Sequence, residues 1–295
     1  MRLGAVVLPV VLALAPCSMA ARAADGSVAV APQYDSTHVY VAPEDVERFA
    51  ASFLATFGGH ATNPVETTVT PTPSRAISEL VQTPVGIVSV FGFKTPIPYP
   101  FGAERTGYLV TDMDAAVAAA GDAGADVLVA PFPDAIGRDA IIQWPGGVDM
   151  QLYWHTKAPS YAPFQSVPEN RVYVSVDRAT AFIDSFLAFS HGKVASDEPR
   201  AAGVAIGRPR DTFRRVRIES AFGKMTVFIT DGHLPYPYGR ETTGYEVSDL
   251  GDTVAKARAA GATIVVEPFA DDGRQSAMVL FPGGYVAEIH ARVAH

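Results

Sequence analysis

The sequence predicts an α+β protein made of four βαβββ modules, arranged as two tandem domains. The main observation is an eleven-residue stretch that occurs twice, as PYPFGAERTGY at Pro98–Tyr108 and as PYPYGRETTGY at Pro235–Tyr245. The second observation is that the offset of 137 residues continues beyond these two marker stretches. Similarity at one fixed offset over such a length indicates that a whole domain is duplicated.

Matching residues continue along both copies and include types that cap helices and form turns. The matched pairs include Val110 and Val247, Asp112 and Asp249, Gly124 and Gly261, Pro131 and Pro268, and Pro145 and Pro282. Asp112 and Asp249 each precede an alanine-rich segment, so we expect them to cap a helix. Gly124 and Gly261 stand where a C-cap glycine belongs.

The first residues have the pattern of an export signal. A basic residue, Arg2, is followed by an apolar core at Val6–Ala15 and by the small-residue site Ala21–Ala23. We therefore expect residues 1–23 to be removed and the mature protein to be periplasmic or secreted. The only cysteine, Cys17, lies in this segment, so the mature chain is expected to have neither a disulfide nor a reactive thiol.

The charge balance argues against two classes of partner. Without residues 1–23, 21 Lys and Arg face 31 Asp and Glu, which gives a formal charge of −10. Because the basic residues form no cluster along the sequence, we expect neither nucleic acid nor, after signal cleavage, a membrane as a partner. A small molecule is the expected ligand, and the oligomeric state is expected to be a monomer or a homodimer.

The domain boundaries follow from the order of the repeats. Residues 24–36 are small and polar and predict a flexible leader, and the first domain covers residues 37–157. Residues 158–169 carry three prolines and predict a linker, and the second domain covers residues 170–295.

Each domain opens with a strand and a helix. Alternation at Thr37–Val41 predicts the strand, which Arg171–Val174 repeats in the second copy. Pro43–Asp45 then starts the helix of the first copy, because proline suits a first turn and acidic residues complement the helix dipole. Phenylalanines at helical spacing continue it to Gly58.

The later elements are predicted at matching places in the two copies. Strands are expected at Ser89–Phe93, Thr106–Thr111, Val127–Ala130, Ala140–Trp144 and Met150–Trp154, with counterparts that include Thr226–Thr230 and Thr243–Ser248, and helices at Asp114–Ala123 and Asp252–Ala260. Each copy therefore has the order β-α-β-β-β twice.

An ordered set of short motifs carries a family resemblance. The first copy has Gly-Tyr-Leu-Val-Thr-Asp before its alanine-rich helix, then Gly-Ala-Asp, Pro-Phe and Pro-Gly-Gly. The second copy has Gly-Tyr-Glu-Val-Ser-Asp, Gly-Ala-Thr, Pro-Phe and Pro-Gly-Gly in the same order. In this the chain resembles the vicinal oxygen chelate superfamily, which includes glyoxalase I, extradiol dioxygenases and bleomycin-resistance proteins.

The resemblance implies that two modules pair and that their strands curl into a mixed sheet whose concave face, the cup, binds a divalent metal. The ligands would come from the first strand, from the strand that opens the second module and from the last strand. At these positions the first copy has His38, Arg105 and Gln151, and the second has Arg171, Thr242 and Glu288. Because arginine stays protonated and cannot ligate a cation, we expect no metal at the usual place in either cup.

In the first cup, strand alternation turns polar side chains inward. Arg105 is expected to bind a carboxylate or enolate of the ligand, and His38 to donate or accept a proton near its unperturbed pKa of about 6.5. Further ligand-binding residues are expected to be Tyr40, Gln151, Tyr153 and Glu104. The alternative is that Arg105 pairs with Glu104 or another acid and that His38 is merely hydrogen-bonded.

In the second cup, Glu288 and His290 lie two residues apart on one strand face, and Glu246 is the third candidate ligand. Such oxygen and nitrogen donors can hold zinc, iron or manganese. Against this interpretation, the family geometry brings Arg171 towards Glu288, and we expect an ion pair there in place of the metal.

Glu104 recurs as Glu241 beside the turns of the two marker stretches, and it either caps backbone amides there or acts on the ligand. Three functions follow from the sequence. The first is an exported protein that binds a small anionic or aromatic molecule in the first cup without a metal. The second is a metal-dependent lyase or dioxygenase that uses Glu288 and His290. The third is a non-catalytic interaction protein.

Overall fold

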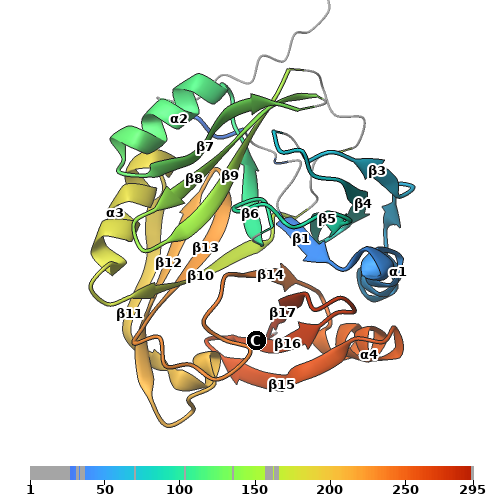
Figure 1. Ribbon diagram of the computed structural model, residues 1–295. Helices are drawn as coiled ribbons and strands as arrows, with labels where there is room; N and C mark the ends of the chain where they lie inside the picture. Colours follow the sequence, from blue (N-terminus) through green and yellow to red (C-terminus); the bar gives the residue numbers. More distant parts are fainter. Residues whose placement is uncertain are drawn as a thin grey trace, which may run out of the picture.

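The computed structural model describes residues 27–30, 33, 37–69, 71–102, 104–134, 136–156, 162 and 166–293 (Figure 1). The export signal expected at residues 1–23 and most of the expected linker lie outside these residues. None of the helices in the described ranges combines the length and the apolar character needed to cross a membrane.

The strands and helices of the two copies correspond closely. The first copy contains β1 (Thr37–Val41), α1 (Val46–Phe57), β2 (His60–Ala61), β3 (Val65–Thr67), β4 (Ala76–Thr83), β5 (Gly86–Phe93), β6 (Arg105–Leu109), α2 (Met113–Asp122), β7 (Asp126–Pro133), β8 (Gly137–Trp144) and β9 (Val148–His155). The second contains β10 (Glu169–Ser175), α3 (Ala179–Ser190), β11 (Lys193–Ala202), β12 (Thr212–Ser220), β13 (Gly223–Thr230), β14 (Thr242–Glu246), α4 (Leu250–Ala259), β15 (Thr263–Asp271), β16 (Arg274–Leu280) and β17 (Val286–Arg292). Short 3₁₀ turns occur at Pro43–Asp45 and Gly203–Ile206.

Each copy forms one curled mixed sheet, which confirms the predicted α+β class. The first sheet has the order β2-β4-β5-β1-β6-β9-β8-β7, with β3 on β4, and the second has the order β11-β12-β13-β10-β14-β17-β16-β15. Within a module the first strand pairs in parallel with the last, as in β1–β5 and β6–β9. The two modules of a sheet meet at an antiparallel pair, β1–β6 or β10–β14.

This central pair positions the predicted ligand residues. His38 on β1 is the register partner of Arg105 on β6, and Arg171 on β10 is the register partner of Thr242 on β14. The last strand, β9 or β17, lies beside the second of these strands. The fold therefore brings together, in each sheet, the three positions that the resemblance singled out.

The predicted helix caps are present. Asp112 Oδ1 accepts a hydrogen bond from the backbone N–H of Ala115 at 2.8 Å, and Asp249 Oδ1 accepts one from Asp252 at 2.9 Å. Gly124 and Gly261 follow the two helices with φ of 95° and 86°, a backbone region that favours glycine.

The hydrophobic cores are shared between the copies. Trp144 on β8 of the first copy packs against Phe186 and Phe189 on α3 of the second, with ring centroids 5.9 and 5.1 Å apart. In the other core, Phe53 on α1 packs against Tyr245 on β14, with centroids 5.5 Å apart. In Figure 1, α2 lies next to α3 on one side of the molecule and α1 next to α4 on the other. Each core is thus built from a module of each copy.

Part of the expected flexible leader is bound to the first sheet. Val28 is buried, and Ala29 forms an antiparallel bridge with Val110. The side-chain oxygen of Gln33 accepts a hydrogen bond from the N–H of Leu109 at 2.6 Å. The described part of the leader therefore continues the hydrogen bonding of β6.

Candidate functional site

The side chains predicted for the first cup come together around Arg105. Its Nε donates to Gln151 Oε1 at 2.8 Å, its Nη1 donates to Tyr40 Oη at 2.8 Å, and its Nη2 lies 3.3 Å from His38 Nδ1. Arg105 and Gln151 are almost completely buried. These groups hydrogen bond to one another. Such mutual bonding is typical of a structural network and also of a ligand pocket.

His38 is held neutral by this network. Because Arg105 is a donor only, His38 Nδ1 accepts, and the hydrogen-bond pattern assigns the ring proton to Nε2, which lies 2.5 Å from Tyr153 Oη. Burial and the neighbouring Arg105 lower the pKa of His38 well below its usual range. The expected titration near 6.5 is therefore wrong, since the charged form is disfavoured by both causes.

Two further carboxylates lie near the first cup. Gln151 Nε2 donates to Asp139 Oδ2 at 3.2 Å, which fixes the orientation of the Gln151 amide. Burial raises the pKa of Glu104 to about 7, against the opposing effect of Arg240 from the second copy. The pKa of Glu104 is thus influenced by Arg240 of the second copy, although Glu104 directly precedes Arg105 in the sequence.

The second cup is organised around Arg171. Its Nη1 lies 3.0 Å from Glu169 Oε1 and 3.6 Å from Glu288 Oε1, and its guanidinium carbon lies 4.7 Å from the centre of the Phe228 ring. Glu288 Oε2 lies 2.7 Å from His290 Nδ1. All of these polar side chains are buried. The predicted ion pair between Arg171 and Glu288 is confirmed.

Glu169 is a member of this cluster that sequence reasoning missed. Both Nη atoms of Arg274 donate to its Oε2 at 3.2 Å, while Arg171 binds the other oxygen. Burial alone would raise the pKa of Glu169, but Arg274 and Arg171 lower it well below its usual range. Glu169 was overlooked because residues 158–169 were interpreted as a linker. Glu169, Arg171 and Tyr173 are nevertheless spaced two residues apart, as residues on one face of a strand are.

Glu246 does not join Glu288 and His290. It is the register partner of His290, but its carboxylate lies 3.2 Å from Lys224 Nζ and 3.0 Å from Arg292 Nε. In the described part of the chain, no three His, Cys, Asp or Glu side chains converge as a metal-binding group. The structure thus brings two of the three candidate metal ligands together and leaves the third in separate ion pairs.

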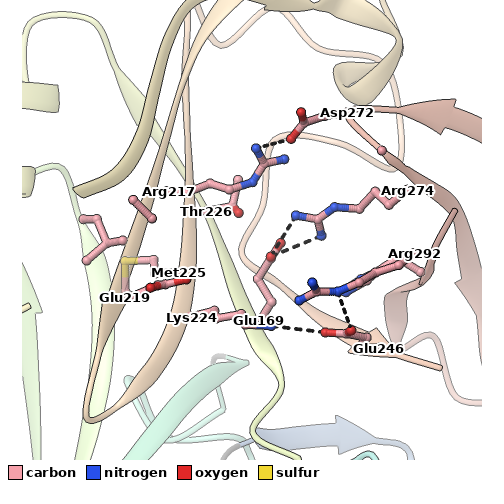
Figure 2. A pocket seen from close by; sticks show the side chains of 14 residues that line it. Glu169, Arg217, Glu219, Lys224, Met225, Thr226, Glu246, Asp272, Arg274 and Arg292 are labelled. Atoms are coloured by element: carbon pink, nitrogen blue, oxygen red, sulfur yellow. Dashed lines mark hydrogen bonds and ion pairs between the residues drawn. The ribbon is translucent and has the colours of Figure 1, made fainter. Parts of the chain in front are cut away.

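A cavity of about 250 Å³ lies at the edge of the second cup (Figure 2). His290 and Glu169 reach it from the cup. Its basic lining residues are Arg217, Lys224, Arg274 and Arg292, and further acidic ones are Glu219, Glu246 and Asp272. The cavity therefore connects the buried Glu288–His290 pair with a wall of charged side chains.

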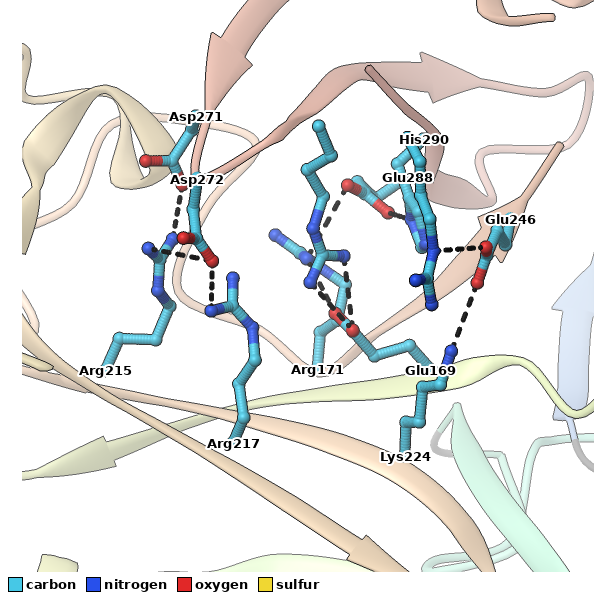
Figure 3. Close-up of polar contacts among 12 residues, drawn as sticks. Glu169, Arg171, Arg215, Arg217, Lys224, Glu246, Asp271, Asp272, Glu288 and His290 are labelled. Atoms are coloured by element: carbon cyan, nitrogen blue, oxygen red, sulfur yellow. Dashed lines mark hydrogen bonds and ion pairs between the residues drawn. The ribbon is translucent and has the colours of Figure 1, made fainter. Parts of the chain in front are cut away.

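Arginines on β12 extend this charged wall (Figure 3). Arg215 lies 3.0 Å from Glu198 and also pairs with Asp271, and Arg217 pairs with Asp272. Burial lowers the pKa of Arg217, and the charges of Arg215 and Arg274 lower it further. Positive charge is therefore crowded around Arg217.

The signal for this cluster was present in the sequence. Arg215 and Arg217 alternate on one strand, with Phe228 and Thr226 as register partners on β13. At the same places in the first copy, Ser78 and Leu80 pair with Phe91 and Ser89 on β5. Comparing the two copies at these positions would have identified the second cup as the charged one.

The donor sets that the described residues form in the two cups do not fit a divalent metal. In the first cup, the Gln151 oxygen and His38 Nδ1 both face the Arg105 guanidinium. In the second cup, the Arg171 guanidinium lies between the two carboxylates that would be ligands. A second cation at either place would be repelled by the first.

No known family profile and no curated protein matches the sequence. Solved structures do match. A mutant of 4-hydroxymandelate synthase from Streptomyces coelicolor has a TM-score of 0.61 at 14% identity, with 90% of this chain and 94% of that one covered. The Mn(II)-bound glyoxalase from Novosphingobium aromaticivorans has a TM-score of 0.54 at 12% identity, with 90% and 84% covered.

The 2,3-dioxygenase LapB from Pseudomonas sp. KL28 has a TM-score of 0.55 at 10% identity, and the match covers 92% of this chain and 95% of that one. At such low identity these similarities bear on the fold and not on the activity. The matches extend over both copies, in agreement with the repeat and with the two curled sheets. The chain is thus a protein with the vicinal oxygen chelate fold, built from four modules in tandem.

Proposed function

We propose that this protein binds a small organic anion in the cavity of the second cup and that His290 exchanges a proton with it. The observation that carries the proposal is that His290 both lines the cavity and forms a 2.7 Å hydrogen bond with Glu288. The anionic ligand expected from the sequence is retained. The proposed binding site is in the second cup instead of the first, because a cavity adjoins the polar cluster there.

The proton-exchange role is supported by the orientation of the imidazole. Glu288 accepts from Nδ1–H of His290, so that Nε2 is the basic nitrogen of the neutral ring. A carboxylate that holds a histidine in one tautomer also stabilises the imidazolium once it forms. Burial alone would raise the pKa of Glu288, but Arg171 and His290 hold it below its usual range, so the carboxylate remains charged.

The preference for an anion is supported by the charge crowding at Arg217. Its lowered pKa reflects burial and then repulsion from two other arginines, which a negative ligand would relieve. Arg217 and Arg274 line the cavity beside His290. The acidic residues that pair with these arginines compete with a ligand, which favours molecules that present a carboxylate or enolate in a matching geometry.

The proposal includes export, as residues 1–23 suggest, and activity without a bound metal. The metal-dependent alternative draws its support from fold neighbours whose names include a Mn(II)-bound glyoxalase and a dioxygenase. The position of the Arg171 guanidinium between Glu169 and Glu288 argues against a bound metal.

The test is a binding screen of small carboxylates and their uncharged amides against the mature protein, by thermal shift and calorimetry. We expect carboxylates to bind and the matched amides not to bind. Arg217→Gln should weaken carboxylate binding by about tenfold, the loss of one charge-assisted hydrogen bond. His290→Asn should keep binding but abolish solvent exchange of an acidic C–H proton on the ligand.

The matched control is Arg208→Gln, because Arg208 pairs with Asp231 and lies outside this cavity. Equal affinity of the wild type for carboxylates and amides, or unchanged affinity in Arg217→Gln, would contradict the proposal.

A further inference from the structure

The cavity of the second cup is lined by two separate groups of basic side chains (Figure 2). The inner group consists of Arg217 and Arg274, beside His290. The outer group consists of Lys224 and Arg292, which are both bound to Glu246. The cavity therefore offers two places at which a negative group of a ligand can bind.

The outer group has more positive than negative charge. Lys224 Nζ lies 3.2 Å from one carboxylate oxygen of Glu246, and Arg292 Nε lies 3.0 Å from the other. Among the described residues, Glu246 is the one carboxylate within ion-pair distance of these two cations. Glu219 is the register partner of Lys224, but its carboxylate lies 3.6 Å from Lys193 instead. Two cations thus share a single anion.

The inner group contains a donor that lacks an acceptor. Arg217 pairs through Nη1 with Glu198 at 3.1 Å and with Asp272. Its Nε is buried and has no hydrogen-bond partner in the described part of the chain. Leaving a buried N–H without an acceptor is costly, so an acidic group that reached it would be stabilised.

Strand geometry places the two groups along one direction of the cup. His290 and Arg292 are two residues apart on β17, so their side chains lie on the same face at positions about 7 Å apart. Arg292 is also the register partner of Arg274 on β16. A ligand held by both groups would therefore extend along β17 with His290 beside it.

The volume of the cavity limits the length of such a ligand. About 250 Å³ corresponds to the volume of about eight water molecules, at about 30 Å³ each. An unbranched dicarboxylic acid of about four to six carbons has about eight to ten non-hydrogen atoms, which is close to this size. A short diacid thus fits the cavity and presents a carboxylate at each end.

We propose that the ligand of the second cup is a short dicarboxylate. The inner group binds one carboxylate, and Lys224 and Arg292 bind the other, for which Glu246 is the internal competitor. This inference rests on the proposed function, from which it takes the anion at the inner group and the proton exchange at His290. It adds the second charge of the ligand and the residues that select for it.

The exposure of the outer group allows a ligand carboxylate to compete with Glu246. The side chains of Lys224 and Arg292 are exposed, and that of Glu246 is half-buried. Ion pairs in such surroundings contribute little to stability, so their rearrangement costs little. Burial alone would raise the pKa of Glu246, but Lys224 and Arg292 lower it, and the carboxylate that a ligand must replace is charged.

The experiment measures the affinity of the mature protein for glutarate and for glutarate monoamide, which has one charge fewer, by calorimetry. We expect the wild type to prefer glutarate by about tenfold, the gain from one charge-assisted contact. In a series from succinate to suberate, affinity should be highest at about four to six carbons, the length that fits the cavity.

Variants of the outer group test which residues select the second charge. Lys224→Gln and Arg292→Gln should each abolish the preference for glutarate over the monoamide. Glu246→Gln should increase it by about fivefold, the scale of one exposed ion pair. The matched control is Arg258→Gln, which also removes one positive charge but lies outside this cavity, paired with Glu267, and should keep the preference.

The preference is a ratio measured within one variant, so a partial loss of folded protein does not change it. Equal affinity of the wild type for glutarate and the monoamide, with both weakened by Arg217→Gln, would overturn this inference and leave the proposed function standing. A preference retained in both Lys224→Gln and Arg292→Gln would also overturn it. Failure of the wild type to bind any carboxylate would overturn the proposed function and this inference together.

Discussion

Glu241 in the second marker stretch binds Thr106 in the first. Its Oε1 accepts from the hydroxyl of Thr106 at 3.0 Å and from the backbone N–H at 3.3 Å. The repeated glutamate therefore does cap a backbone amide, but the amide belongs to the other copy. Glu104, its equivalent, raises the pKa of Tyr245 in the second copy, although burial is the main cause. The second marker stretch is thus hydrogen-bonded to the first, and the charge of Glu104 acts in turn on a residue of the second copy.

These two glutamates predict a dependence of stability on pH. Burial raises the pKa of both Glu241 and Glu104 from 4.5 to about 7 in the folded protein. A pKa raised by folding means that the folded state binds the proton more tightly, so the stabilisation is complete below pH 4.5 and is lost as the pH rises through 7. Unfolding in urea should therefore need less denaturant at pH 8 than at pH 5.5.

Glu241→Gln should flatten this dependence, because glutamine stays neutral and can still accept from Thr106. The control is Glu267→Gln, an exposed residue whose ion pair with Arg258 lies on the surface. A slope in Glu241→Gln equal to that of the wild type would show that Glu241 is not the titrating group.

The first-cup network predicts a large loss of stability in Arg105→Ala. The substitution removes the partner of Gln151, Tyr40 and His38 and leaves buried polar groups unsatisfied. We expect a loss of about 3 kcal/mol, since each such group costs about 1 to 3 kcal/mol. Arg75→Ala, which removes an exposed ion pair with Glu66, should change stability by less than about 1 kcal/mol. Urea unfolding of the two variants provides the comparison.

The repeat made the fold and the ligand positions predictable, because strand alternation and matched turns are local properties of the chain. It also led to the ion pair between Arg171 and Glu288. The role of Glu169 was missed because its proline-rich surroundings suggested a linker, although its alternation with Arg171 and Tyr173 placed it on the strand. The contact of Glu241 with Thr106 depends on how the copies pack, and no periodicity within one copy encodes that contact.

The shared cores predict that the two copies unfold together. Trp144 of the first copy is almost completely buried against Phe186 and Phe189 of the second. Trp144→Ala should cost about 3 to 5 kcal/mol, as large-to-small changes in a core do. Differential scanning calorimetry should show one transition in the wild type and one, at lower temperature, in the variant. Two separate transitions would indicate that each copy has an independent core.

A matched pair of glycine substitutions tests the packing of the first cup. A Cβ on Gly107 would overlap the ring of Tyr153, which is buried and bound to His38, so the ring would have to move. Gly107→Ala should therefore be destabilising, by about 1 to 3 kcal/mol for an overpacked core. Gly121 lies in α2, and no described atom comes within 4 Å of the position that a Cβ would take, so Gly121→Ala should stabilise by about 0.5 to 1 kcal/mol through helix propensity. Opposite shifts in melting temperature are expected, and a shift of the same sign in both variants would mean that Tyr153 does not pack over Gly107 in solution.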